Sequence, residues 1–191
     1  MIRYGAIIAI VVAASAVAWQ QSQRAPRAVS SSSEAVLQQW PQITPKQVAA
    51  IQIHHGTTTV QLHKNGEQWM VKDRYGEVAA NKEQVTRLLT DVTTMRPQRL
   101  ISSNPDNFAR FRLGDDADRL TLRGAGSKPL LDLLIGKPGT DLISTTVRRA
   151  GSNAILSVNR SLAWQLGREP SAWRAPKPKP KQKPATKPDS K

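Results

Sequence analysis

The sequence contains no cysteine and few aromatic residues: 191 residues include two phenylalanines, two tyrosines and five tryptophans. The absence of cysteine excludes a disulfide framework, a thiol nucleophile and a cysteine-ligated metal. It does not exclude a place outside the cytoplasm, since a domain of about 130 residues buries enough core to fold without disulfides.

Acidic residues are also scarce, with 14 Asp and Glu against 28 Lys and Arg and a net charge of +14. The excess is uneven, because residues 174–191 hold seven basic residues against Asp189 alone. Residues 40–173 mix both signs, a pattern that argues against a dedicated nucleic-acid groove. Nucleic acid is therefore not an expected partner.

The only long uncharged run spans residues 5–19, slightly short of the roughly 20 apolar residues that cross a bilayer. Residues 1–19 form either a retained signal anchor or a cleaved signal peptide, for which Ala16-Val17-Ala18 is a small-x-small cleavage pattern. Tyr4 and Trp19 flank the run as interfacial anchors do, which favours retention. Either way we expect a protein of the bacterial inner membrane, single-pass with its domain on the periplasmic side, or secreted after cleavage. Residues 20–34 are predicted to be a polar linker.

The stretch from residue 58 to 95 predicts a hairpin followed by a helix. Asn65-Gly66 is the strongest short-range signal for a two-residue hairpin turn, and it would pair Leu62 with Trp69. Asn81 is a good N-cap, and apolar residues then recur at helical spacing. These apolar residues are Val85, Leu88, Leu89, Val92 and Met95.

Short alternating segments before and after this unit predict further strands. One such strand is expected around Ile51 and Ile53, and four more are expected between residues 120 and 158. A short helix over 162–166, capped by Ser161, should follow. The predicted fold class is α+β, with antiparallel β meanders around one central amphipathic helix, an N-terminal hydrophobic segment and a disordered C-terminal tail. The predicted domain spans residues 35–173, and the tail spans 174–191.

The sequence offers no catalytic, cofactor or metal residues. His54 and His55 are adjacent on a strand and point to opposite faces, so they cannot join His63 in one metal site. The aspartates at 115, 116 and 118 lack the glycine and closing glutamate of a calcium loop. Residues 136–139, Gly-Lys-Pro-Gly, lack the spacing of a phosphate loop and are interpreted as a β-turn. No serine lies in a nucleophile elbow, so we expect no enzyme.

The tail alternates lysine with proline from residue 176 onward, a composition that cannot bury a core. A flexible polycation attracts anionic lipid headgroups or wall polymers, with strong dependence on salt. The alternative is a plain spacer. The candidate residues for an anionic partner are Lys177, Lys179, Lys181, Lys183 and Lys187.

The ordered region resembles the bacterial domain of unknown function 4340 over roughly residues 40–173. The resemblance is carried by dispersed positions. They are Trp40-x-x-Ile43, Val48-x-x-Ile51-x-Ile53, Trp69-x-Val71, Val85-x-x-Leu88-Leu89, Phe111-x-Leu113, Leu120-x-Leu122, Leu133-Leu134-Ile135-Gly136 and Val147-Arg148.

The resemblance implies a domain outside the cytoplasm behind one membrane segment. Some relatives are encoded with ABC-transporter components of the gliding-motility type, which implies an accessory role in an envelope complex. Two features depart from the family: Arg112 stands where relatives usually have glycine in Phe-Gly-Leu, and the lysine–proline tail is not a family feature.

Three hypotheses follow. The first is a non-catalytic, membrane-anchored accessory subunit of an ABC-transporter-like or other envelope complex, acting through protein binding. The second is an envelope tether whose basic tail binds anionic lipid or cell-wall polymer. The third, a hydrolase, would need a convergent polar pocket that the sequence does not show.

Overall fold

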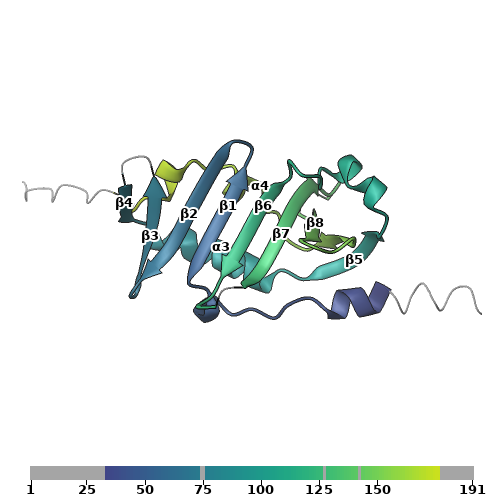
Figure 1. Ribbon diagram of the computed structural model, residues 1–191, viewed down its shortest axis with the longest axis horizontal. Coiled ribbons are helices and arrows are strands. Elements are labelled where there is room, and N and C mark those ends of the chain that lie inside the picture. Colours follow the sequence, from purple (N-terminus) through teal and green to yellow (C-terminus); the bar gives the residue numbers. More distant parts are fainter. Residues whose placement is uncertain (1–32, 74–75, 127, 142, 177–191) are drawn as a thin grey trace, which may run out of the picture.

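A single antiparallel sheet of nine strands forms the frame of the protein in the part of the chain that the structure describes (Figure 1). That structure is a computed structural model describing residues 33–73, 76–126, 128–141 and 143–176. The strand order is β4-β3-β2-β1-β6-β7-β8-β9-β5. The strands are β1 (Ala50–His55), β2 (Thr58–Asn65), β3 (Gln68–Asp73), β4 (Gly76–Ala79), β5 (Pro97–Ser102), β6 (Asp118–Arg123), β7 (Pro129–Pro138), β8 (Thr145–Arg149) and β9 (Ile155–Val158).

The predicted arrangement of separate meanders around a central helix is wrong. Strand β6 pairs with β1 along its length, with Ile51 opposite Leu122 and Ile53 opposite Leu120. This pairing joins the strands before the helix to those after it in one sheet. The helix therefore packs against one face of the sheet instead of lying between two (Figure 1).

That helix, α3 (Lys82–Thr94), begins where the sequence predicts. The Asn81 side chain accepts hydrogen bonds from the backbone N–H groups of Glu83 and Gln84. This cap satisfies two of the donors that a helix start leaves unpaired. The predicted apolar stripe is buried: Val85, Leu88, Leu89, Val92 and Met95 are at most 5% exposed.

The other helices in the described ranges are short. They are η1 (Pro45–Gln47), η2 (Pro105–Asn107), η3 (Ala109–Phe111), α4 (Ala163–Leu166) and η4 (Pro170–Trp173), and residues 33–38 are also helical. The cap predicted at Ser161 is wrong, because Leu162 occupies the N-cap of α4 and makes no side-chain capping bond.

The hairpin between β2 and β3 forms with a register two residues from the predicted one. Asn65 pairs with Gln68 and Leu62 with Val71, so the loop residues are Gly66 and Glu67. Gly66 alone in this loop has positive φ, +60°, which matches a type II′ turn with glycine first. Because a shift of two residues keeps each side chain on its face, Leu62, Trp69 and Val71 are still buried together.

The main core lies between α3 and the sheet surface that faces it, which we call the inner face. β1, β2, β3, β6 and β7 all contribute to it, and Trp173 from η4 completes it at the β3 end. The opposite surface of the sheet is the outer face.

Of the segments that the structure describes, residues 104–117 cover the outer face near β7, β8 and β9. A second cluster of Leu113, Ala117, Leu134 and Ile155 is buried there. Arg148 holds this covering segment: its guanidinium lies 4.0 Å from the Phe108 ring centre and donates to the Leu113 carbonyl at 3.0 Å.

Gly136 lets this segment approach β7. A Cβ atom at that position would lie 2.3 Å from the Phe111 carbonyl oxygen, so only glycine fits without a shift of the backbone. The β-turn predicted at residues 136–139 is wrong in this respect, since β7 continues to Pro138 with a bulge after Ile135.

Candidate functional site: the open outer face

The outer face of β1, β2 and β6 is exposed to solvent. Side chains on these strands alternate between the buried inner face and the outer face. The outward residues Gln52, His54, Gln61, Arg119 and Arg123 are all exposed. This half of the sheet therefore presents a wide polar surface.

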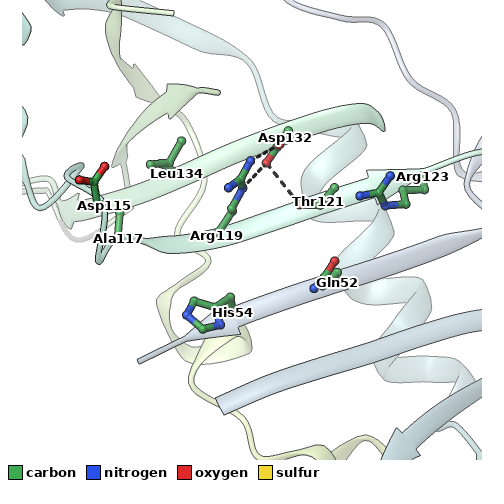
Figure 2. A pocket seen from close by; sticks show the side chains of 9 residues that line it. All are labelled: Gln52, His54, Asp115, Ala117, Arg119, Thr121, Arg123, Asp132 and Leu134. Atoms are coloured by element: carbon green, nitrogen blue, oxygen red, sulfur yellow. Dashed lines mark hydrogen bonds and ion pairs between the residues drawn. The ribbon is translucent and has the colours of Figure 1, made fainter. Parts of the chain in front are cut away.

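A shallow groove of about 440 Å³ lies on this surface, where β1, β6 and β7 run side by side (Figure 2). β1 supplies Gln52 and His54, and the segment leading into β6 supplies Asp115 and Ala117. The rest of the lining comes from β6 and β7: Arg119, Thr121, Arg123, Asp132 and Leu134.

The centre of the groove is a bidentate ion pair between Arg119 and Asp132. Arg119 Nε donates to Oδ1 at 2.7 Å and Nη2 donates to Oδ2 at 2.6 Å, while the Thr121 hydroxyl donates to Oδ1 at 3.2 Å. The hydrogen bonds from Arg119 hold the pKa of Asp132 below its usual range and raise the pKa of Arg119. Asp132 is therefore ionised at neutral pH and is unsuited to proton transfer there.

The groups around this pair are available to a partner. The Arg123 guanidinium makes no hydrogen bond to the described residues and influences Asp132 only through its charge. Figure 2 shows Gln52 and His54 beside the pair on the neighbouring strand. Such a surface offers donors and acceptors to another polypeptide, while the two charges at its centre, Arg119 and Asp132, are already paired.

The three histidines are held apart, each with its own partner. His54 Nδ1 lies 3.1 Å from the Thr59 hydroxyl, His55 Nδ1 lies 2.9 Å from Asp118, and His63 Nε2 lies 3.5 Å from Glu77. Within the described ranges no three His, Asp or Glu side chains gather closely enough to hold a metal ion. Of the three clustered aspartates, Asp115 lines the groove and Asp118 begins β6.

The predicted anionic-partner lysines at 177, 179, 181, 183 and 187 lie outside the described residues, as does the hydrophobic segment 1–19. In the part that is described, no helix is long and apolar enough to cross a bilayer.

A comparison with protein-family models matches residues 69–186 to the domain of unknown function DUF4340. The chain belongs to the DUF4340 family. The match covers the fold from β3 to the end of the described chain and continues into the lysine–proline tail, which the sequence had placed outside the family pattern. No curated protein and no solved structure matches the chain.

Sequence reasoning missed the groove, although one signal for it is present. Arg119, Thr121 and Arg123 alternate with two leucines, and Asp132 lies between Leu131 and Leu133, so each residue belongs to an outward face. The sequence does not show that β6 and β7 are neighbours in this register, which places Thr121 opposite Asp132. Without the register, the ion pair between Arg119 and Asp132 cannot be derived.

Proposed function

We propose that this DUF4340 protein is a non-catalytic, membrane-anchored protein of the periplasmic side that binds a subunit of an envelope complex through its outer face. The observation that carries the proposal is the exposed outer face of β1, β2 and β6, with a groove whose central charges are already paired. A pre-formed surface of this kind suits docking without rearrangement.

Two further features support this assignment. The first is the hydrophobic segment at residues 1–19, followed by a polar linker, which favours attachment to the inner membrane. The second is the implication, drawn from the family resemblance, of a role beside ABC-transporter components. The partner we propose is accordingly an integral membrane protein of such a complex.

The absence of a catalytic role is part of the proposal. General acid–base chemistry at neutral pH needs a group whose pKa lies near 7. The two aspartates with a shifted pKa, Asp132 and Asp141, both shift downward because of hydrogen bonds to their ionised forms. These shifts favour structural roles for both carboxylates.

The test is photo-crosslinking in membranes followed by affinity purification and mass spectrometry. A photo-reactive amino acid at Gln52 or Gln61 samples the outer face, and one at Thr86 or Thr90 samples the exposed side of α3. We expect a stoichiometric crosslink to one integral membrane protein from the outer-face positions only. Crosslinks from α3 alone would move the interface to the helix, and recovery of the uncrosslinked chain at all four positions would overturn the proposal.

A second candidate is the envelope tether, which the composition of the tail favours. Six lysines lie between residues 177 and 191 against a single aspartate. A polycation of this kind binds anionic lipid or wall polymer with strong salt dependence. The two functions are compatible, since they use different parts of the chain.

A further inference from the structure

A second concave site lies on the outer face at the β5 end of the sheet, where residues 104–117 stop covering it. Its volume is about 560 Å³, within the range of roughly 300–1,000 Å³ typical of small-molecule sites. Ser157 and Thr146 form its floor as neighbours on β9 and β8, and Arg99 is the neighbour of Ser157 on β5.

Apolar groups line part of the site. Phe111 from η3, Ile101 from β5 and Pro138 from β7 all contribute to the lining. The position of η3 depends on Gly136, because any larger residue there would push Phe111 away from β7. Gly136 thus fixes where Phe111 lies, and the small side chains of Thr146 and Ser157 leave space beside it over β8 and β9.

Three cations surround this space. Arg99, Arg110 and Lys137 come from three separate elements, and all three are exposed at the rim. The only acid in the lining is Asp141, whose Oδ1 accepts from the Ser144 backbone N–H and the Ser144 hydroxyl, both at 2.8 Å. Those bonds lower the pKa of Asp141, so it stays ionised and the lining carries a net charge of +2.

One further donor is available at the floor. The Ser157 hydroxyl has no hydrogen-bond partner among the described residues, whereas the Thr146 hydroxyl donates to the Lys137 carbonyl at 2.8 Å. Guanidinium, ammonium and hydroxyl groups are the donors that phosphate oxygens prefer.

We propose that this cavity binds an organic phosphate, with the phosphate dianion held by Arg99, Arg110 and Lys137 and an apolar group packed on Phe111 and Ile101. The dianion matches the charge of the lining, and the volume leaves room for a body larger than inorganic phosphate. The same chemistry is offered by a soluble phosphomonoester and by the headgroup of an anionic lipid.

The test measures binding of phenyl phosphate and of inorganic phosphate to the full chain in phosphatidylcholine nanodiscs by isothermal titration calorimetry. We expect saturable binding that is tighter for phenyl phosphate, because only it contacts the apolar wall. The variant Arg99→Gln/Lys137→Gln should bind at least about tenfold more weakly, since two charge-assisted contacts are lost.

The matched control is Lys82→Gln/Arg87→Gln, which removes the same two charge types from exposed positions on α3. It should bind as the wild type does. Ser157→Ala, which removes only one hydroxyl oxygen from the floor, gives a second test if the double variant melts early, and it should weaken binding. Absence of saturable binding, equal losses in both double variants, or equal affinity for the two phosphates would each overturn the proposal.

A lipid source is distinguished by repeating the titration in nanodiscs that contain phosphatidic acid. If the membrane supplies the ligand, phosphatidic acid should occupy the site and phenyl phosphate should bind more weakly in these nanodiscs. In the Arg99→Gln/Lys137→Gln variant, phosphatidic acid should no longer change the affinity for phenyl phosphate. Unchanged phenyl phosphate affinity assigns the site to a soluble phosphomonoester. Neither result depends on the docking proposed above through β1, β2 and β6, which the crosslinks at Gln52 and Gln61 test separately.

Discussion

Arg112 adopts a backbone conformation that suits glycine. Its φ of 57° and ψ of 45° are left-handed, and it is the only non-glycine residue with positive φ among those described. This conformation costs an ordinary L-residue roughly 1–2 kcal/mol. It occurs at the position where the family resemblance leads us to expect glycine, at the end of η3.

Replacing Arg112 with glycine should therefore stabilise the protein. We expect the free energy of unfolding to rise by about 0.5–1 kcal/mol, because relief of strain exceeds the added entropy of glycine in the unfolded chain. Urea denaturation measures the change. Arg112→Ala is the control, since it removes the charge and keeps the strain, and a gain of equal size in that variant would refute the argument.

Asp132 makes stability depend on pH. Because the pKa of Asp132 is lower in the folded than in the unfolded state, its ion pair stabilises the protein above pH 4 or so, and this contribution is lost as pH falls through the lowered pKa. Asp132→Asn should lower the free energy of unfolding by about 1 kcal/mol at pH 7, which is the scale of a partly exposed ion pair. The cost should shrink toward zero in denaturation curves at decreasing pH, and a constant difference between pH 7 and pH 2 would contradict it.

Among the elements, local sequence signals predict α3 and the existence of the β2–β3 hairpin, although not the register of the hairpin. The cap at Asn81, the apolar stripe and the glycine of the turn all act within a few residues of one another. β4 and β5, the two edge strands of the sheet, were missed. β4 has only four residues and pairs with β3 directly before it, whereas the partner of β5, β9, lies far along the chain. Pro97 stops α3 and also begins β5, and only pairing with β9 makes that segment a strand.

Two tryptophans near the end of the described chain differ in how they pack. Trp173 from η4 is 1% exposed in the main core, while Trp164 on α4 is 55% exposed beneath the Arg168 guanidinium, 3.6 Å away. Trp173 also fixes the chain at the β4 edge: its carbonyl accepts from Asn81 N–H at 2.7 Å, and Ala175 N–H donates to Ala79 at 2.8 Å. The last described segment therefore covers an edge strand that would otherwise be open.

Trp173→Ala should destabilise the protein by about 3–5 kcal/mol through the cavity it leaves in the core. It should also speed hydrogen exchange of the amides in β4 and at Asn81, because the covering segment loses its anchor. Trp164→Ala, the matched control, should cost no more than about 1 kcal/mol and leave those amides unchanged. Equal losses in the two variants would show that the core does not depend on η4.

At the scale of the whole molecule, the two candidate surfaces come from pairings of distant segments, which explains why the sequence did not reveal them. The groove combines β1 with β6 and β7. The cavity lined by Arg99, Arg110 and Lys137, which we call the phosphate cavity after its proposed ligand, combines β5 with β7, β8, β9 and η3. The alternation along the predicted strands marks Arg119, Arg123 and Asp132 as outward positions, but Arg99 was not visible in this way because β5 was missed. The neighbours of these residues are set by the β1–β6 and β5–β9 pairings, which no local pattern encodes.

The described chain begins and ends at opposite ends of the long axis of the sheet. Residues 33–38 lie near β8 and β9, where Arg149 donates to the Gln39 carbonyl, and η4 lies against β3 (Figure 1). The membrane segment that we propose before residue 33 and the basic tail after residue 176 would therefore attach to opposite ends of the fold. This geometry suits a tail that reaches a surface other than the membrane holding the anchor.

We predict that the full chain in phosphatidylcholine nanodiscs binds separate vesicles containing phosphatidylserine, and that this binding needs the tail lysines. Each lysine near an anionic surface contributes on the order of 1 kcal/mol at moderate salt. Replacing the six lysines from 177 to 191 with glutamine should abolish vesicle co-sedimentation, as should raising the salt by several-fold, since the Debye length then shrinks. The glutamine variant keeps the length of the tail and should melt at the wild-type temperature. Co-sedimentation that survives both the substitution and the salt would assign vesicle binding to the folded domain, with the cations of the phosphate cavity as the next positions to change.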